Sequence, residues 1–532
     1  MIISNYLTHG FMPFLLYLWL MKQKLPIGIQ SFGKIREDKL LYIDKTEVIY
    51  RLIDDGSYYF LARPRRFGKS LTLSTIKELF LGRKDLFEGL WIENRWNWEE
   101  IYPVIHIGFS SLGYKDIGLV NAIVGELTRI AKDYGLTLTE KGPALLFREL
   151  IHKLRASFGK VVILIDEYDK PIIDYLDELP QAKANQKILK TFYSVIKDSD
   201  PYLRFLLITG VSKFSKVSVF SELNNLKDLT LHPKYSTLVG CTQAELEHYF
   251  EEDLNEFTGV LAETREELLQ LIKKWYNGYT WDGKNFLYNP FSLLSFFDTG
   301  QFHNFWFSTG TPTFLIQLLT SVNVYDLERT EVGMVAFDSY DIENIDPYAL
   351  LFQTGYLAIK AVEPFGLYVL DYPNREVKDS MLQYLMAGFS HGSYSKSTPI
   401  VLHLRKAFLQ NDEAQIIKII NSLFKSIPSQ IFIKDKEAYY HSVIYLVFQY
   451  LGLFIDAEVN TSDGRIDAVV QTDEIIYLLE FKLDESAEAA LKQIRDKAYG
   501  DKYKGLAKKI TALGINFSSQ TKSIESWQRA DF

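Results

Sequence analysis

The sequence predicts an α/β protein in which strands and helices alternate along the first half of the chain. Two observations support this fold class. The run Val161–Ile165 is unbroken, apolar and mostly β-branched, which is typical of a parallel strand covered on both faces. The segment Arg204–Thr209 (RFLLIT) repeats that character, and amphipathic helical patterns separate such strands. We therefore expect a doubly wound parallel sheet with helices packed on it.

The elements before residue 161 can be predicted in chain order. Asp44 and Glu47 form a capping-box pattern that opens a helix to Leu52. The other elements are predicted from their apolar patterns, as strands over Tyr58–Ala62 and Pro103–Phe109 and as helices over Gly68–Phe80 and Val120–Asp133.

Past about residue 240 the pattern becomes mainly helical, and it stays so to about residue 425. Thr242 and Glu245 form a second capping box, which opens a helix to about Glu251, and Glu263–Trp275 is helical too. Aromatic turns follow, among them WYNGYTW, LYNPFSLLSFF and FWFSTGTP, whose spacing predicts no chemistry. From Asp435 the order helix, strand, hairpin, strand, helix predicts a separate small α/β domain. We expect four segments, at residues 1–24, 25–240, 241–425 and 426–532.

Composition limits the classes of function. The 532 residues are 47% hydrophobic and 24% charged, which is typical of globular proteins and excludes a disordered, collagen-like or coiled-coil chain. The net charge of -8 excludes a protein covered in basic surface, so nucleic acid would have to bind in a local groove. The single cysteine, Cys241, excludes a disulfide framework and a multi-cysteine zinc site, and it fits a reducing, cytoplasmic setting. We interpret Cys241 as a buried structural residue.

The N-terminal segment contains an apolar run, Phe11–Met21. This run is too short to cross a bilayer, which needs ~20 apolar residues, and it lacks the cationic start and cleavage site of a signal peptide. Three interpretations stay open: a start codon assigned too early, with translation beginning at Met21; a buried or loosely ordered helix; or a membrane-tethering segment. No other stretch approaches a transmembrane span, and we expect no stable membrane partner.

The segment Arg63–Ser70 (RPRRFGKS) lies between a predicted strand and a predicted helix, as a phosphate-binding loop requires. At a helix N-terminus, backbone N–H groups and the helix dipole favour an anion. In this interpretation Lys69 reaches the β- and γ-phosphates of ATP, and the Ser70 hydroxyl binds Mg²⁺. The usual pattern begins with glycine, where this chain has Arg63. The alternative is a basic, solvated loop that contains Gly-Lys-Ser by chance and whose middle arginines only face water.

A second element favours the nucleotide interpretation. The strand at residues 161–165 ends in two carboxylates, of which Asp166 would hold Mg²⁺ through water and Glu167 would act on the attacking water as general base. Thr209 ends the RFLLIT strand and is either a sensor of the γ-phosphate or a residue that only caps a turn. The residues predicted to bind nucleotide are Arg65, Arg66, Phe67, Gly68, Lys69, Ser70, Asp166 and Thr209.

Several sequence segments of the chain resemble the corresponding segments of one protein family. The resemblance is to the AAA-ATPase-like family of gut bacteria and other microbes, and it rests on LPIGIQSFGKIREDKLLYIDKT, FLARPRRFGKSLTLSTIKELF, VILIDEYDKPI and LLITGVSKFS. WYNGYTW, YNPFSLL, FWFSTGTP and LLFQTGYLAIK are similar too, so it covers nearly the whole chain from Leu25. It implies a P-loop NTPase-type ATPase domain and a C-terminal nuclease-like domain of the PD-(D/E)XK superfamily. In this family the loop lacks the leading glycine, and members begin near a Met-Lys pair, which favours Met21 as the start.

A second group of candidate residues lies in the predicted C-terminal hairpin. Asp467 and Glu480 lie on strands joined by the turn Thr472–Glu474, and Lys482 points to the same face as Glu480. In phosphodiester hydrolysis, Asp467 and Glu480 would bind Mg²⁺, and Lys482 would orient the attacking water or stabilise developing charge. On spacing alone, a salt bridge at a strand edge is the alternative.

The phrases DGRIDAVV and YLLEFK resemble the PD-(D/E)XK hallmark as it occurs in this family. KQIRDKAY, with Gln493 and Tyr499, resembles the helix that follows it. The superfamily often supplies a further acid from the preceding helix, for which Glu437 is the candidate, with His441 on the same helical face; a solvated glutamate is the alternative. The lysines of Lys492–Lys509 form either a phosphate-contacting stripe or a solvated helix face.

Together these features predict a cytoplasmic ATPase coupled to a metal-dependent nuclease, with ATP and Mg²⁺ as cofactors and nucleic acid as partner. A nucleotide-dependent switch that binds nucleic acid or protein without cleavage is the alternative, and a structural protein with two vestigial sites is the third interpretation. The sequence does not decide whether the nucleic acid is DNA or RNA, or whether the protein forms a homo-oligomer. The predicted catalytic residues are Glu167, Asp467, Glu480 and Lys482, and the predicted metal ligands are Ser70, Asp166, Asp467 and Glu480.

Overall fold

The computed structural model describes most of the chain, and it divides the chain into two compact units. The described residues are 23–213, 220, 225–307, 313–337, 342–343, 345–390, 394–425, 436–459 and 468–532. The first unit comprises Met1–Trp306 and Glu331–Val369, and the second comprises Phe307–Thr330 and Leu370–Phe532. The apolar run Phe11–Met21 lies outside the described residues. Within the described part of the chain, no helix combines the length and apolarity needed to cross a bilayer.

A five-stranded sheet forms the centre of the first unit, in the order β2-β3-β4-β1-β5. All of its strand pairs are parallel, and β4 lies between β1 and β3, so Phe60 pairs with Ile208, and Ile163 with Leu206. Every residue of β3 is buried, which confirms the prediction of a covered parallel strand. The strands are β1 Tyr58–Ala62, β2 Val104–Gly108, β3 Val161–Asp166, β4 Leu203–Gly210 and β5 Lys227–Asp228.

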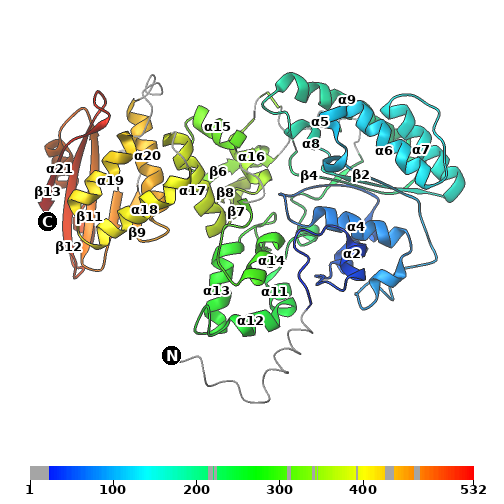
Figure 1. The fold of residues 1–532 in the computed structure, drawn as a ribbon, viewed down its shortest axis with the longest axis horizontal. Coiled ribbons are helices and arrows are strands. Elements are labelled where there is room, and N and C mark those ends of the chain that lie inside the picture. The colour runs from blue at the N-terminus through cyan, green and yellow to red at the C-terminus, as the bar shows by residue number, and fades with distance from the viewer. Residues whose placement is uncertain are drawn as a thin grey trace, which may run out of the picture. The chain divides into compact units, whose positions relative to one another are not determined.

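Helices cover both faces of this sheet. Figure 1 shows α2 and α4 on one face and α6, α7 and α9 on the other, so the predicted doubly wound α/β arrangement is present. The apolar side chains of these helices, such as Leu73 and Ile76 of α4 and Leu150 of α7, are fully buried. The helices are α2 Phe32–Glu37, α3 Thr46–Asp55, α4 Lys69–Phe80, α5 Tyr114–Ile117, α6 Leu119–Asp133, α7 Pro143–Phe158, α8 Lys170–Ile173 and α9 Leu179–Asp198.

The predicted capping box at Asp44 and Glu47 is wrong. Helix α3 begins after Lys45, which makes no side-chain capping bond. The Asp44 carboxylate instead accepts hydrogen bonds from the backbone N–H groups of Thr46 (2.8 Å) and Trp91 (2.7 Å). Asp44 therefore links the start of α3 to a loop far along the chain, a role that a local capping pattern does not reveal.

The middle of the chain combines helices with a small sheet. The capping box of Thr242 and Glu245 is confirmed, since each side chain accepts a hydrogen bond from the other residue's backbone N–H, at 3.2 and 2.8 Å. The helix it opens ends at Tyr249, close to the predicted end near Glu251. The helices here are α11 Gln243–Tyr249, α12 Glu251–Phe257, α13 Arg265–Tyr276, α14 Pro290–Thr299 and α16 Pro347–Thr354. This region also contains a three-stranded sheet in the order β6-β8-β7, which the mainly helical sequence pattern did not predict. Its strands are β6 Thr330–Gly333, β7 Ala358–Glu363 and β8 Leu367–Asp371.

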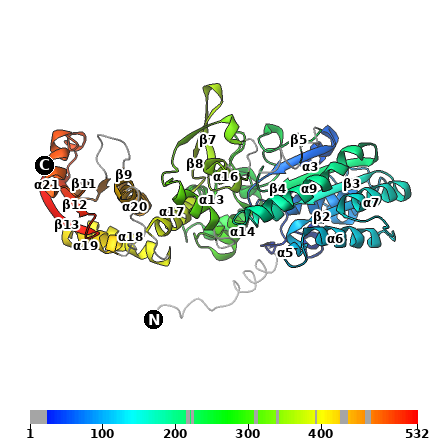
Figure 2. The same ribbon diagram turned by 90° about the horizontal axis from the view of Figure 1, so that it is seen from above.

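The second unit contains a mixed five-stranded sheet in the order β13-β12-β11-β10-β9. β11 and β12 are parallel, and the other pairs are antiparallel. Helix α21 packs on one face and α18, α19 and α20 on the other (Figure 2). The strands are β9 Asp456–Val459, β10 Ala468–Gln471, β11 Ile475–Leu483, β12 Lys509–Ser518 and β13 Ser523–Asp531. The helices are α15 Thr313–Ser321, α17 Arg375–Ser390, α18 Tyr394–Leu409, α19 Glu413–Lys425, α20 Lys436–Leu451 and α21 Ala487–Asp496.

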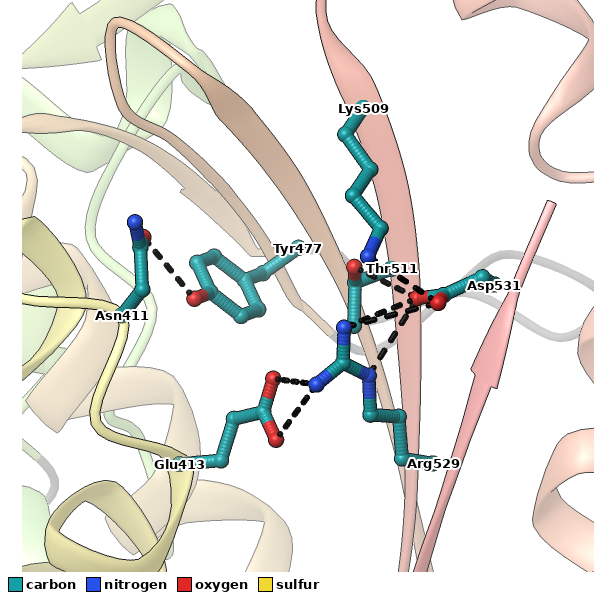
Figure 3. A network of polar contacts seen from close by, with 7 residues as sticks. All are labelled: Asn411, Glu413, Tyr477, Lys509, Thr511, Arg529 and Asp531. Atoms are coloured by element: carbon teal, nitrogen blue, oxygen red, sulfur yellow. Dashed lines mark hydrogen bonds and ion pairs between the residues drawn. The ribbon is translucent and has the colours of Figure 1, made fainter.

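A network of polar contacts links the last strand of this sheet to its neighbours (Figure 3). Arg529 of β13 contacts Glu413 in the first turn of α19 at 2.8 Å and Asp531 at 3.1 Å. Asp531 also pairs with Lys509 at 3.0 Å and accepts a hydrogen bond from the Thr511 hydroxyl at 3.0 Å. The network therefore joins β13 to β12 and to α19.

Candidate nucleotide and nuclease-like sites

The predicted phosphate loop connects the end of β1 to the start of α4. Gly68 directly precedes the helix and has φ 94°. That conformation is accessible to glycine but strained for residues with a Cβ atom, so the turn into α4 depends on glycine here. Arg66 also has a positive φ, 67°. The loop therefore makes a tight left-handed turn immediately before the helix N-terminus.

Lys69 begins α4, and its side chain turns back into the loop. The residue is 5% exposed, and its ammonium donates hydrogen bonds to the backbone carbonyls of Arg63 and Pro64, both at 2.8 Å. Burial lowers the pKa of Lys69, whereas the nearby charges of Asp166 and Glu167 oppose that shift. The structure thus holds the lysine inside the loop and close to the two predicted carboxylates.

The carboxyl ends of β3 and β4 bring the other predicted residues together. The Thr209 hydroxyl donates a hydrogen bond of 2.6 Å to Asp166, whose side chain is buried. Glu167 follows with φ 52°, and burial raises its pKa, while the positive charge of Lys69 opposes the increase. Lys69, Asp166, Glu167 and Thr209 therefore share one edge of the parallel sheet, although they come from three different strand ends.

Asp169 is a further buried carboxylate in this region, which the sequence pattern did not predict as a site residue. It accepts hydrogen bonds from the N–H groups of Val211 (3.0 Å) and Ser212 (2.7 Å) and from the Ser212 hydroxyl (2.8 Å). Burial raises the pKa of Asp169, although the hydrogen bonds from Ser212 act in the opposite direction. Asp169 thereby fixes the chain that leaves β4 next to Thr209. Its closeness to Asp166 and Glu167 in IDEYD was the available signal.

The remaining loop residues differ in their surroundings. Phe67 is fully buried, and its ring packs edge-to-face on Tyr279 and Trp281, with centroids 4.8 and 5.3 Å away. The exposed Arg66 places its guanidinium 4.9 Å above the ring of Phe291. Arg65 is exposed as well. Of these three predicted nucleotide-binding residues, the two arginines face solvent and Phe67 anchors the loop.

The C-terminal group is centred on β11. Lys482 lies 3.7 Å from Glu480 on the same face of the strand and donates a hydrogen bond of 2.7 Å to the side-chain oxygen of Gln493 in α21. The Gln493 amide in turn donates to Glu480, which is 2% exposed. Gln493 therefore links the predicted carboxylate to the predicted lysine.

Asp467 lies outside the described residues. Ala468, which follows it in the chain, pairs with Leu479, which precedes Glu480. Among the residues that the structure describes, no group of three or more His, Cys, Asp and Glu side chains is arranged to hold a metal ion. The proposed pairing of Asp467 with Glu480 thus stays a prediction.

Other candidates from the sequence have different outcomes. Glu437 lies in α20, but its side chain is outside the described part of the structure, whereas His441 is exposed. Helix α21 ends at Asp496, so the lysines of Lys492–Lys509 do not lie along one helix face and that interpretation is wrong, whereas a phosphate-contacting stripe stays a prediction. Cys241 is buried as predicted, and burial raises its pKa.

Comparisons with known proteins find matches to two separate segments of the chain. A family model described as "Predicted AAA-ATPase" matches residues 26–220, and one described as "PD-(D/E)XK nuclease superfamily" matches residues 435–527. The chain is 41% identical over 519 residues to a protein of Azotobacter chroococcum mcd 1 named "Uncharacterized protein in vnfD 5'region", covering 94% of this chain and 98% of that relative. No solved structure matches the chain. The chain therefore belongs to the AAA-ATPase-like family and carries a C-terminal domain of the PD-(D/E)XK nuclease superfamily.

Proposed function

We propose that the first unit binds and hydrolyses ATP. The proposal rests on one observation: at the carboxyl edge of a parallel sheet, Lys69 lies close to Asp166, Glu167 and Thr209. Phosphoryl transfer depends on positioning and on positive charge near the phosphates. The N-terminus of α4, preceded by Gly68, supplies backbone donors for an anion, and Lys69 supplies the charge.

The residues at this edge suit a magnesium ion. Ser70 and Asp166 supply a hydroxyl and a carboxylate oxygen, which are the hard ligands that Mg²⁺ prefers. When bound, Mg²⁺ neutralises charge on the β- and γ-phosphates. Thr209 orients Asp166 through its 2.6 Å hydrogen bond. In this proposal Glu167 accepts the proton of the attacking water, and Lys69 donates to the phosphates in place of the carbonyls of the loop.

The same proposal assigns metal-dependent cleavage of DNA or RNA to the C-terminal domain. It is supported by the shared face of Glu480 and Lys482 and by the pairing of Ala468 with Leu479. Carboxylate oxygens of Asp467 and Glu480 suit Mg²⁺, which makes bound water a better nucleophile. Lys482 would stabilise charge on the phosphate, in a cytoplasmic protein whose nucleotide state controls cleavage.

One observation favours the second candidate, a nucleotide-dependent switch that binds nucleic acid or a protein without cutting. Gln493 engages both Glu480 and Lys482, and Glu480 is 2% exposed. Cleavage requires this carboxylate to reach a metal ion and substrate. A domain in which Gln493 keeps Glu480 covered would bind without cleaving.

The ATPase proposal is tested on the full chain with Mg²⁺ and ATP. Lys69→Ala should abolish both binding and turnover, while Glu167→Gln should keep ATP bound and stop hydrolysis. Lys77→Ala is the matched control, because Lys77 lies on the same helix with its side chain 39% exposed. ATP turnover that Lys69→Ala leaves unchanged contradicts the proposal.

The nuclease proposal is tested with single- and double-stranded DNA and RNA, in Mg²⁺ or Mn²⁺, with and without ATP. Lys482→Ala should remove cleavage and leave ATP turnover unchanged, and Lys418→Ala, which changes an exposed lysine of α19, should retain both. Mass measurement in solution reports whether a homo-oligomer forms. A wild type that binds nucleic acid in every condition but cuts none supports the switch.

A further inference from the structure

The first residue of the phosphate loop is a buried arginine. Arg63, which stands where the usual pattern has glycine, is 1% exposed. Its guanidinium donates to the backbone carbonyls of Ala62 at 2.9 Å and Thr230 at 2.6 Å, and its centre lies 4.1 Å from the ring centroid of Trp281. A guanidinium stacked on an indole is favoured most where water is excluded, and Trp281 is itself buried.

Residues far along the chain hold the rest of the loop as well. The Trp306 indole N–H donates a hydrogen bond of 3.3 Å to the carbonyl of Arg65, and the Gly240 N–H donates one of 3.1 Å to the carbonyl of Phe67. Gly355 lies so close to Pro64 that a Cβ atom there would be 2.7 Å from the proline ring. The aromatic turns that had no predicted chemistry thus supply two tryptophans that contact this loop.

We propose that Arg63 and Trp281 are positioning residues for the phosphate loop, and that their stacked pair sets the course of the chain where a leading glycine does so in the usual pattern. The proposal rests on the proposed binding of ATP at Lys69. It assigns a structural role in the loop to the sequence segment WYNGYTW, which ends in Trp281.

The connection to the phosphates runs through Lys69. Its ammonium donates to the carbonyls of Arg63 and Pro64, which are the residues held by Trp281 and Gly355. Those carbonyls set the position of the ammonium, and a bound phosphate competes with them for its protons. Loss of the stacked pair lets the carbonyls shift, which moves the lysine and the loop's N–H groups away from the positions that phosphate requires.

The test is an equilibrium titration of the full chain with a fluorescent ATP analogue in Mg²⁺. Trp281→Leu should weaken binding about tenfold, because the ring beneath Arg63 is lost. Trp281→Phe keeps an aromatic ring and should bind within about threefold of wild type. Trp275→Leu is the matched control: Trp275 belongs to the same segment, but its ring packs on Phe302, 5.7 Å away.

Thermal unfolding of each variant separates positioning from general stability. The proposal requires affinity loss in Trp281→Leu, recovery in Trp281→Phe and wild-type affinity in Trp275→Leu. Affinity that instead falls in parallel with unfolding temperature in both leucine variants overturns it. If Trp281→Leu does not fold, Arg63→Lys decides: it keeps the charge but not the planar group, so it should bind severalfold more weakly.

The failure of this inference is distinct from the failure of the ATPase proposal. A wild type that binds no nucleotide defeats both. A wild type that binds nucleotide tightly, with Trp281→Leu and Arg63→Lys binding equally well, overturns only the positioning role.

Discussion

Two lysines, one in each unit, lie next to carboxylates, but they are held in different ways. Lys69 donates to two backbone carbonyls and is 5% exposed. Lys482 contacts the side chains of Gln493 and Glu480, and its own side chain is 21% exposed. The first lysine is therefore positioned by the path of the backbone, and the second by neighbouring side chains.

The two sites should therefore be sensitive to different kinds of substitution. A change in the backbone path of the phosphate loop moves the acceptors of Lys69, wherever the change originates. On β11, the regular strand fixes the backbone, so the side chains that contact Lys482 decide its position. Substitutions that change the backbone conformation of the phosphate loop should disrupt the first site most. In the second site, the side-chain amide of Gln493 should decide how Lys482 and Glu480 are placed.

The largest effect is expected from Gly68→Val. Gly68 has φ 94°, where a β-branched residue is strongly strained. The turn before α4 would open, and nucleotide affinity should fall by about 100-fold, or about 2.7 kcal/mol. Titration with a fluorescent ATP analogue measures the loss.

The matched control is Gly113→Val, at φ 63° and with no atom within 4 Å of an added Cβ. It should lower stability by about 1–2 kcal/mol without changing nucleotide affinity. Equal affinity in the two variants would contradict the view that backbone geometry places Lys69.

Gln493→Leu tests the side-chain arrangement of the second site. The substitution removes the donor to Glu480 and the acceptor for Lys482. Because Glu480 is 2% exposed, loss of its donor should lower the free energy of unfolding by about 2 kcal/mol. Urea unfolding measures this loss, and ATP turnover should not change. A stability equal to that of the exposed control Lys492→Ala would show that Gln493 does not hold the pair.

The sequence predicted the residues that follow strongly patterned elements. The unbroken apolar run of β3 placed Asp166 and Glu167 at a strand end, and parallel pairing brings such ends to one edge. The spacing of Glu480 and Lys482 likewise predicted their shared face, which their 3.7 Å contact confirms. In both cases the periodicity of one strand was sufficient.

Contacts between distant segments could not be predicted in this way. Asp44 has a capping pattern, yet it binds the N–H of Trp91 in a separate loop. The stacking of Arg63 on Trp281 joins two segments whose local patterns carry no sign of each other. Buried aromatic and guanidinium groups find partners through tertiary packing, so the local sequence pattern indicates the phosphate loop but not the residues that hold it.

A smaller effect, dependent on pH, is expected at Glu167. Burial raises its pKa above the ordinary value of about 4.5, so the folded state binds this proton more tightly than the unfolded chain does. The contribution of Glu167 to stability is complete below that ordinary value and is lost as pH rises through the raised pKa. Wild type should therefore lose unfolding free energy relative to Glu167→Gln as pH increases from about 4 to about 7. Urea unfolding of both proteins across this range measures the difference, and a difference that grows in favour of wild type contradicts the prediction.

The smallest effect is expected at the network of Figure 3, where charges lie near solvent rather than in a buried site. Arg529→Ala breaks contacts with Glu413 and Asp531, and it should lower stability by at most about 1 kcal/mol, because exposed ion pairs gain little over hydration. Lys504→Ala breaks a single, more exposed pair with Asp501 and should have almost no effect. Unfolding measured in low and in high salt compares the two, since salt should reduce the Arg529 effect further. If Arg529→Ala instead loses several kcal/mol of unfolding free energy at every salt concentration, this network behaves like the buried contacts of Gln493 and not like surface ion pairs.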